Sequence, residues 1–369
     1  MKYTKKINKH YEYITKKDYL EKSANNLCDL KNASALLEGG CFHLLTGDKQ
    51  SDKIKLIKNS MPHFFEGICG DEDKVINVYG ELLSALCAYS KVTGEKDLSS
   101  QIGIANFLVS SLYEKIEEII SSNEQNFALC LSAVNGVSEY YAITKEQRAK
   151  ELLNYACEKI NKLNVYNTTS DCFDYLNLCL GLLKYAFLED KSAVNNAIAL
   201  LYDHFMVNAQ SLNYASATTF KNKSETNGAS TAKSLEVALA LLNNTKDNRY
   251  LTLARRIWFN GMQFCQRENG QVGLDTFTDE KITLRVKTYE VTQFVTPAYA
   301  CGLKCWATNK NLFEESGELY KDRRGRFFLG DKMFARDLSG FFGRDLIEIP
   351  TLTAFDKQTA NQLEFKLVF

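Results

Sequence analysis

A helical hairpin that recurs six times is the feature of this sequence that most restricts its fold. Each copy consists of an apolar helix, a short polar turn and a second amphipathic helix, and the turns centre on Thr46, Thr93, Thr144, Asp190, Thr245 and Thr308. Neighbouring turns lie 46 to 63 residues apart. Most of the turns share a Thr-(Gly/Lys/Asn)-(Asp/Glu/Lys) core, which suits the end of one helix and the acidic first turn of the next. Because one hairpin cannot cover its own apolar face, consecutive hairpins must stack on one another.

Two features of the hairpins favour an all-α, closed (α/α)6 toroid over an open solenoid. First helices such as YGELLSALCAYS and DYLNLCLGLLKYAF are apolar nearly all round, as is typical of helices buried on two sides. The connections between hairpins lengthen to residues 205–230 and 266–297, whereas the turns within hairpins stay short. Long connections at one end of a rigid ring are the usual place for a binding site. We therefore expect six inner helices, six outer helices and a large pocket at one end.

The C-terminal end of the chain differs from the hairpins. We expect residues 1–322 to form the toroid domain and residues 323–369 to form a C-terminal extension packed on it. The chain ends in QLEFKLVF, whose alternation of polar and apolar residues predicts one strand at most.

Charge and hydrophobicity exclude several classes of partner. The 45 basic residues balance the 45 acidic residues, so no overall field favours nucleic acid or an anionic membrane. The first twenty residues lack the apolar run of a signal peptide, and no later stretch approaches the ~20 apolar residues of a membrane span. We expect a cytoplasmic protein with neither a nucleic acid nor a membrane as its partner.

Cysteine and glycine patterns argue against a metal or nucleotide cofactor. Most of the eleven cysteines lie within apolar helical patterns, where they behave as small core hydrophobes. Cys301 and Cys305 share a helix face, but the four histidines lie in unrelated contexts, so a zinc ligand set is hard to assemble. The GQVG segment at 270–273 lacks the preceding strand and the following Lys-Ser/Thr of a phosphate-binding loop. We expect no metal and no other cofactor.

The fifth hairpin and the loop before it carry a more specific pattern. The segment SETNGAS (224–230) precedes LALLNNTKDNRYLTLARRIWFNGMQFCQRENGQVG (239–273). This pattern resembles the (α/α)6 glycoside hydrolases related to family 127, the β-L-arabinofuranosidases, and their uncharacterised bacterial relatives. The hairpin spacing extends a weaker similarity through most of the chain. The resemblance implies the same toroid and an activity on carbohydrate.

The resemblance also implies a metal site, which this sequence lacks. In the family, a glutamate and three cysteines hold a zinc ion, and one cysteine is the nucleophile. Glu225 stands at the glutamate position and Asn227 at one cysteine position, while Phe294 and Val295 stand near the adjacent cysteine pair. Three of the four ligands are therefore missing, and the resemblance implies neither a zinc ion nor a thiolate nucleophile for this chain.

Carboxylates on the two long connections are the remaining candidates for catalysis. Glycoside cleavage needs one carboxyl group to protonate the leaving oxygen and a second to activate water or attack the sugar. We predict that Glu225 acts with Asp275 or Glu290. Each has a structural alternative: Glu225 near a helix dipole, Asp275 as a turn cap, and Glu290 in an ion pair with Arg285 or Lys287.

Polar and aromatic residues of the same connections are candidates for substrate binding, namely Tyr214, Asn227, Arg267, Asn269 and Tyr289. Arg267 and Asn269 offer hydrogen bonds to hydroxyl groups, and the tyrosines offer a surface on which a sugar face stacks. Trp258 lies on an apolar helical stripe and is expected in the core instead.

These features predict a glycoside hydrolase-like protein that acts on or binds a small-molecule or oligosaccharide ligand, by metal-independent acid/base chemistry if it is active. One alternative is a catalytically degenerate relative that serves as a binding or scaffold protein. Another is a biosynthetic cyclase or lyase, because this fold carries several chemistries.

Overall fold

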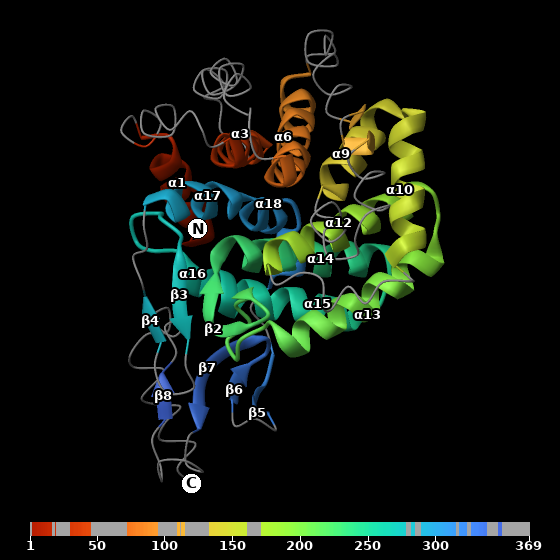
Figure 1. Cartoon of the computed structure of the whole chain (residues 1–369). Coiled ribbons are helices and arrows are strands. Elements are labelled where there is room, and N and C mark those ends of the chain that lie inside the picture. Colours follow the sequence, from red (N-terminus) through yellow and green to blue (C-terminus); the bar gives the residue numbers. More distant parts are fainter. Residues whose placement is uncertain are drawn as a thin grey trace.

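The computed structural model describes residues 2–16, 19, 30–45, 72–94, 109–110, 112–114, 133–160, 171–277, 282–284, 289–314, 317–322, 326–337 and 346–348. Of the described chain, most is helical (Figure 1). None of the described helices is both long enough and apolar enough to cross a membrane.

The inner helices form a closed ring. In chain order they are α3 (Leu30–Leu45), α6 (Glu72–Thr93), α9 (Val134–Thr144), α12 (Cys172–Leu188), α14 (Gly228–Thr245), α17 (Tyr289–Ala298) and α18 (Ala300–Thr308). Each helix from α3 to α14 contacts the next, α17 and α18 both contact α14, and both return to α3. The ring therefore closes between α3 and the α17–α18 pair, and the expected all-α toroid is confirmed.

Other helices pack outside this ring. They are α1 (Lys2–Ile14), α10 (Gln147–Ile160), α13 (Ser192–Asn208), α15 (Asn248–Arg256), a π-helix (Ile257–Met262), α16 (Gln263–Cys265) and a 3-10 helix (Lys310–Leu312). Figure 1 shows α10 and α13 along the outer side of the molecule, beyond α9 and α12. Each pairs with an inner helix next to it in sequence, as the hairpin pattern predicts.

The recurring threonine ends the first helix of several hairpins. Its hydroxyl group donates to the carbonyl oxygen four residues earlier, over 3.0 Å at Thr93, 2.9 Å at Thr144, 2.7 Å at Thr245 and 2.9 Å at Thr308. The residue after the threonine has a left-handed backbone at Gly94, Lys145 and Lys246. This conformation closes a helix, so the Thr-(Gly/Lys) pair is a C-terminal stop signal.

The core contains the residues that the apolar patterns predict. Trp258 is buried and stacks on Trp306, with ring centroids 5.6 Å apart. All eight cysteines in the described part of the chain are buried and unbridged. Both findings match the sequence-based expectation of core positions.

The long connections around the fifth hairpin form a small sheet. Four antiparallel strands lie in the order β1 (Ala217–Thr219), β2 (Asn222–Asn227), β3 (Leu274–Phe277) and β4 (Ile282–Leu284). Strand β2 leads directly into α14, whose first backbone N–H groups are capped by the Asn227 side chain. The sequence predicts irregular loops for these segments, because strands this short that pair with residues about fifty positions away leave little local pattern.

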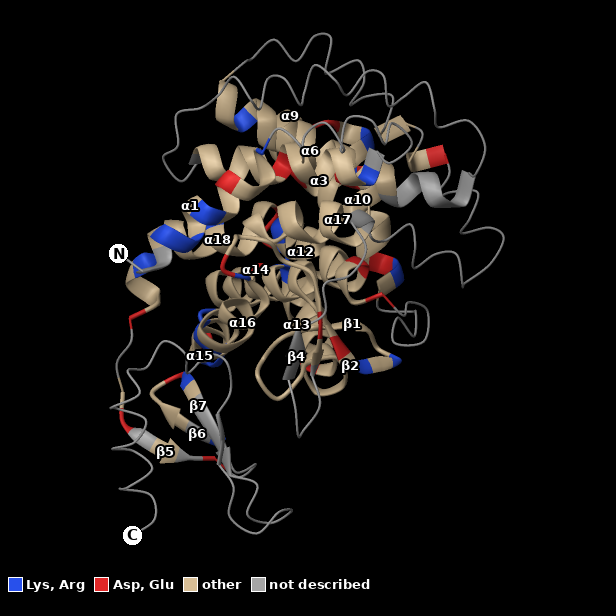
Figure 2. Ribbon diagram, turned by 90° about the vertical axis from the view of Figure 1, so that its left-hand side faces the viewer, with Lys and Arg blue, Asp and Glu red and all other residues tan. Residues whose placement is uncertain are grey.

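A second sheet follows the toroid and corrects the prediction of one C-terminal strand. Its antiparallel strands are β5 (Leu319–Lys321), β6 (Arg326–Leu329), β7 (Lys332–Asp337) and β8 (Leu346–Glu348). It lies at one end of the molecule, away from α6 and α9 (Figure 1 and Figure 2). Strand β5 precedes the boundary predicted at residue 322, and the QLEFKLVF segment lies outside the described residues.

Candidate functional site

A pocket lies at the centre of the ring and is lined by residues of α3, α6, α9, α12, α14 and α17. Its volume is about 350 Å³, part of it open to solvent. The polar side chains in its lining are Glu38, Glu81, Ser84, Asn135, Asn177 and Lys233. Asn135 is the second residue of α9, and Lys233 lies in the second turn of α14. The pocket is thus near the N-terminal ends of these helices, at the end of the ring where β2 enters α14.

Glu81 on α6 is the most perturbed acid of the pocket. Its Oε1 atom lies 3.6 Å from Lys31 Nζ, and neither carboxyl oxygen has a hydrogen-bond partner within the described chain. Burial raises the pKa of Glu81 to about 8; the Lys31 ammonium opposes this shift, and Asp174 and Glu38 add to it. Glu81 therefore carries a proton at neutral pH and can donate it.

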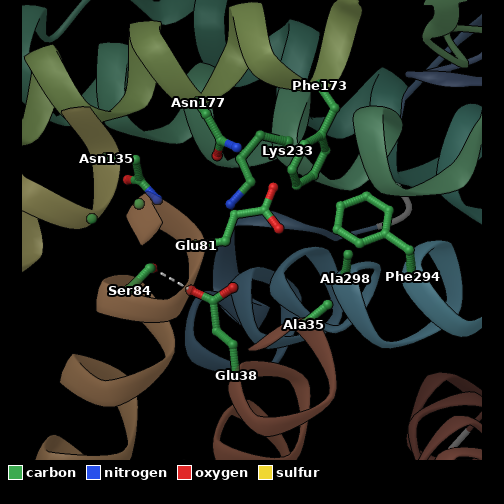
Figure 3. A pocket seen from close by; sticks show the side chains of 12 residues that line it. Ala35, Glu38, Glu81, Ser84, Asn135, Phe173, Asn177, Lys233, Phe294 and Ala298 are labelled. Atoms are coloured by element: carbon green, nitrogen blue, oxygen red, sulfur yellow. Dashed lines mark hydrogen bonds between the residues drawn. The ribbon is translucent and has the colours of Figure 1, made fainter. Parts of the chain in front are cut away.

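Glu38 on α3 faces the same pocket as Glu81. The Ser84 hydroxyl donates a hydrogen bond of 2.6 Å to Glu38 Oε1, which fixes the orientation of the carboxyl group. Figure 3 shows the Glu38 and Glu81 side chains entering the pocket from neighbouring helices. Two carboxyl groups with different environments in one pocket are the arrangement that acid/base catalysis uses.

Lys233 is the cation of the pocket lining. Its Nζ atom donates to Glu236 Oε2 over 3.0 Å, and Lys304 donates to Glu236 Oε1 over 3.4 Å. Burial alone would lower the pKa of Lys233, but Glu236 raises it well above its usual value. Burial would raise the pKa of Glu236, but Lys233 and Lys304 lower it to about 2. Both groups are therefore charged and paired.

A second, partly exposed ion cluster lies further along the inner helices. Lys91 of α6 and Lys184 of α12 both donate to the Glu139 carboxylate of α9. Burial would raise the pKa of Glu139, but the two lysines hold it well below its usual range. Lys184 Nζ also donates to Asn135 Oδ1 over 2.9 Å, which joins this cluster to the pocket.

One wall of the pocket is aromatic. The Phe173 and Phe294 rings meet edge to face, with centroids 5.1 Å apart and planes at 83°. Lys31 Nζ lies 4.7 Å from the Phe294 centroid, and Lys233 Nζ lies 5.6 Å from the Phe173 centroid. Each ammonium group lies over the face of one ring.

The structure does not bring the side chains of Glu225 and Asp275 together. Strand pairing places Asp275 directly opposite Thr226, so these two side chains share a face of the sheet and Glu225 points to the other face. Glu290 lies in the first turn of α17, and its side chain is outside the described residues. Neither Glu225 nor Asp275 belongs to the pocket lining.

Asp275 instead forms an internal ion pair. It is fully buried, and its Oδ1 atom accepts a hydrogen bond of 2.6 Å from Arg267 Nη2. Burial raises the pKa of Asp275 to about 7, against the opposing effect of Arg267. Arg267 also donates to the Cys265 carbonyl oxygen over 2.8 Å, so the pair ties β3 to the end of α16.

Two of the other predicted binding residues form hydrogen bonds within the protein, and the side chain of a third is not among the described residues. Tyr214 is buried with φ of +66°, and its hydroxyl accepts a hydrogen bond of 3.1 Å from Arg256. Asn269 Oδ1 accepts from the Gln271 backbone N–H over 3.0 Å. Tyr289 begins α17, and its side chain is not among the described residues. Their role in binding remains a prediction.

The residues at the family's zinc positions do not fit a zinc ion. Asn227 Oδ1 accepts hydrogen bonds from the backbone N–H groups of Ala229 and Ser230, which uses the side chain as a helix cap. Phe294 presents only hydrocarbon to the pocket. Across the described part of the chain, no three His, Cys, Asp or Glu side chains gather as a metal ligand set.

The pocket residues that were not predicted from the sequence share one feature. Glu81, Asn177 and Lys233 are polar residues that lie next to apolar stretches of inner helices. A polar group at a position buried on two sides needs a partner, and a pocket can provide one. The sequence-based prediction placed the site on the long connections and not on the ring helices.

Comparison with known proteins supports the fold. No family model and no curated protein matches the sequence. The chain is similar to a solved glycoside hydrolase, with a TM-score of 0.57 and 13% identity over 85% of this chain and 59% of that one. It is also similar to a GH127 β-L-arabinofuranosidase from Geobacillus stearothermophilus T6, with a TM-score of 0.58 and 10% identity over 92% of this chain and 68% of that one.

The same fold occurs in sugar epimerases. The chain is similar to cellobiose 2-epimerase from Bacillus thermoamylovorans B4167, with a TM-score of 0.52 and 12% identity over 75% of this chain and 87% of that one. It spans 59% and 58% of two of the glycoside hydrolase structures. Identities this low establish the fold alone. The chain has the six-hairpin (α/α)6 toroid fold that glycoside hydrolases and sugar epimerases share.

Proposed function

We propose that this protein is a glycoside hydrolase-like enzyme that binds a carbohydrate-like ligand in the central pocket and acts on it by metal-independent acid/base chemistry. One observation carries the proposal: Glu38 and Glu81 enter a single pocket from neighbouring helices, and burial raises the pKa of Glu81 to about 8. A buried carboxyl group that is protonated at neutral pH is the form that a general acid requires.

In the proposed reaction, Glu81 donates its proton to the oxygen of the leaving group. The Lys31 ammonium, 3.6 Å from Glu81 Oε1, stabilises the carboxylate that results. Glu38, oriented by Ser84, accepts a proton from the attacking water or from a sugar hydroxyl. Positioned acid/base groups of this kind contribute about 10² to 10⁴ in rate.

The test is a panel of 4-nitrophenyl glycosides, including the β-L-arabinofuranoside, together with unlabelled oligosaccharides. For any glycoside that the wild type cleaves, we expect Glu81→Gln to lower kcat by roughly 100-fold or more with little change in affinity. Asp203→Asn, on the exposed outer helix α13, is the control and should retain full activity. Equal turnover by wild type and Glu81→Gln contradicts the role of Glu81.

A second candidate is the epimerisation of a free sugar, because solved sugar epimerases share this fold. The chain is similar to two of them over 76% and 75% of its residues. Two carboxyl groups can remove and return a proton at one carbon atom. Incubation with reducing sugars in D₂O distinguishes the reactions, because epimerisation by proton transfer can place deuterium on carbon and hydrolysis does not. Sugar binding without either reaction would indicate a degenerate binding protein.

A further inference from the structure

The exposed face of the outer helix α13 is apolar. Val207 and Leu200, 76% and 67% exposed, are the two most exposed large hydrophobic side chains in the described part of the chain. They lie seven residues apart, and the exposed Ala193 lies seven residues before Leu200, so all three share one stripe of the helix. Single apolar residues on a surface are ordinary, whereas a continuous apolar stripe indicates a contact surface.

This helix also lacks the charges of a helix that faces water. The outer helix α10 has five charged side chains among its 14 residues, namely Arg148, Lys150, Glu151, Glu158 and Lys159. Among the 17 residues of α13, Asp203 is the only charged residue of these types. Charged residues are depleted at the centre of protein interfaces. The composition of α13 is therefore that of a contact surface, and the composition of α10 is that of a solvated surface.

The single charge of α13 is neutralised at the edge of the stripe. Asp203 Oδ2 accepts a hydrogen bond of 3.2 Å from Arg249 Nη1 of α15, and both side chains are about half exposed. His204 lies on the stripe and is largely uncharged at pH 7, because burial and the nearby Lys223 both lower its pKa. The stripe therefore has no net charge, and a second copy of the same surface can approach it without repulsion between like charges.

The stripe is complementary to itself. Ala193 and Val207 lie at equal distances in sequence on either side of Leu200, and so do Asn196 and His204. When two copies of α13 cross antiparallel at Leu200, the small Ala193 of one copy faces the large Val207 of the other. Asn196 then faces His204, and an amide and an imidazole ring can form a hydrogen bond. A two-fold axis forms each of these contacts twice.

From these features we propose that α13 is the contact surface of a homodimer, in which the α13 helices of two copies pack antiparallel about a two-fold axis at Leu200. At a rise of about 1.5 Å per residue, the contact from Ala193 to Val207 is about 21 Å long. A single helix pair of this length forms a small interface, so the dimer is reversible. None of the residues of α13 lines the central pocket, and dimerisation is independent of the carbohydrate function.

The experiment measures the mass of the full chain by sedimentation velocity from about 1 µM to about 200 µM. We expect the wild type to pass from monomer to dimer as its concentration rises. Leu200→Arg should raise the dissociation constant at least tenfold, because it places two guanidinium groups side by side on the two-fold axis. The matched control is Asn8→Arg at an exposed position of α1, which lies on the opposite side of the molecule from α13 (Figure 1). It should dimerise as the wild type does.

Cysteines at the same two positions locate the contact. Leu200→Cys should form a disulfide-linked dimer on oxidation with diamide, since the two-fold axis brings the two thiols together, and Asn8→Cys should not. The eight native cysteines in the described part of the chain are buried, and wild type treated in the same way gives the background. A wild type that stays monomeric at every concentration would mean that a different partner covers the stripe, and it overturns the inference. A dimer that Leu200→Arg does not weaken, or that Leu200→Cys does not link, overturns it as well.

Discussion

Buried charges in this chain are stable only in pairs, and Arg267 with Asp275 is a clear example. The side chains are 14% and 0% exposed, and a hydrogen bond of 2.6 Å joins them. We expect Arg267→Met to lower the free energy of unfolding by about 3–5 kcal/mol, because it leaves a buried carboxylate uncompensated. Guanidinium chloride unfolding at pH 7.5 provides the measurement.

Two further variants separate the loss of charge from the loss of packing in this experiment. The double variant Arg267→Met, Asp275→Asn should recover part of the stability, because the uncompensated charge is gone. Arg249→Met removes two ion pairs, with Asp203 and Asp247, whose members are 55% and 44% exposed, and it should cost at most about 1 kcal/mol. If Arg267→Met costs no more than Arg249→Met, the structural role assigned to this pair is wrong.

A buried histidine pair makes the stability of the protein depend on pH. His10 Nδ1 lies 2.8 Å from His43 Nε2, and His10 Nε2 lies 2.6 Å from the Thr296 carbonyl oxygen. Because a carbonyl oxygen only accepts, His10 donates from Nε2 and must accept from His43 at Nδ1. Burial lowers the pKa of His10 from 6.5 to about 4, against the opposing effect of the Thr296 bond. Burial also lowers the pKa of His43.

The sign of this pH dependence follows from the unfolded chain. As pH falls from 6.5 toward 4, the unfolded protein takes up a proton at His10 and the folded protein does not, so folding becomes less favourable. By pH 5, His10 alone should cost about 2 kcal/mol of stability. We expect His10→Gln to lose less stability than the wild type between pH 7.5 and pH 5, measured by denaturant unfolding. Parallel losses in the two proteins would refute this assignment.

At the scale of elements, the π-helix after α15 holds the C-terminal sheet. Asn260 within it is fully buried, donates to the Asp331 carbonyl oxygen over 3.0 Å and accepts from the Met333 backbone N–H over 2.7 Å. The wider turn of a π-helix places this side chain toward the turn between β6 and β7. One amide thus satisfies two backbone groups of the second sheet.

Loss of this amide should loosen the sheet and leave the ring intact. In Asn260→Ala, we expect backbone amides of β6 and β7 to exchange hydrogen at least tenfold faster, because two buried groups lose their partner. Amides of α12 and α14 should be unaffected, and Asn243→Ala, on an exposed part of α14, should change neither region. Hydrogen exchange that is unchanged in β7 would show that the sheet has another anchor.

Some elements of the structure are determined by residues that lie close together in the sequence, and others are not. Helices were predictable because apolar periodicity and stop signals such as Thr144 with Lys145 lie within a few residues of each other. Strand β2 pairs with β3, which lies about fifty residues further along the chain. The residues next to β2 in the sequence therefore do not indicate this pairing. For the pocket, the sequence predicted that it lies at one end of the ring but not which residues line it. Glu81 on α6 and Asn177 on α12 lie far apart in the sequence. They line the same pocket only because the helices close into a ring.

At the scale of the whole molecule, close contacts between inner helices hold the ring at the level of the pocket. A Cβ atom on Gly136 of α9 would lie 2.0 Å from the Gly80 carbonyl oxygen of α6. A Cβ atom on Gly80 would lie 2.5 Å from Ala133 Cα. Both contacts are with backbone, which cannot move aside as a side chain can. Gly80 and Gly136 adjoin Glu81 and Asn135, so the spacing of α6 and α9 also sets the spacing of these pocket side chains.

These close contacts predict that replacing one of the glycines by alanine lowers the stability of the protein, whereas the same change in an ordinary helix raises it. Replacing a helical glycine by alanine ordinarily favours the helix by about 1 kcal/mol. Gly136→Ala should instead destabilise the protein by about 1–3 kcal/mol, because the new methyl group forces α6 and α9 apart. Gly302→Ala on α18 is the control: its Cβ atom meets the end of the Met262 side chain and the Ala232 methyl group rather than backbone, so it should cost less stability than Gly136→Ala. Thermal unfolding and sugar affinity are measured on both variants. Both quantities depend on the contact between α6 and α9, because moving these helices apart also separates Glu81 from Asn135. A Gly136→Ala protein as stable as Gly302→Ala, with unchanged affinity, would mean that the ring tolerates wider spacing than these contacts allow.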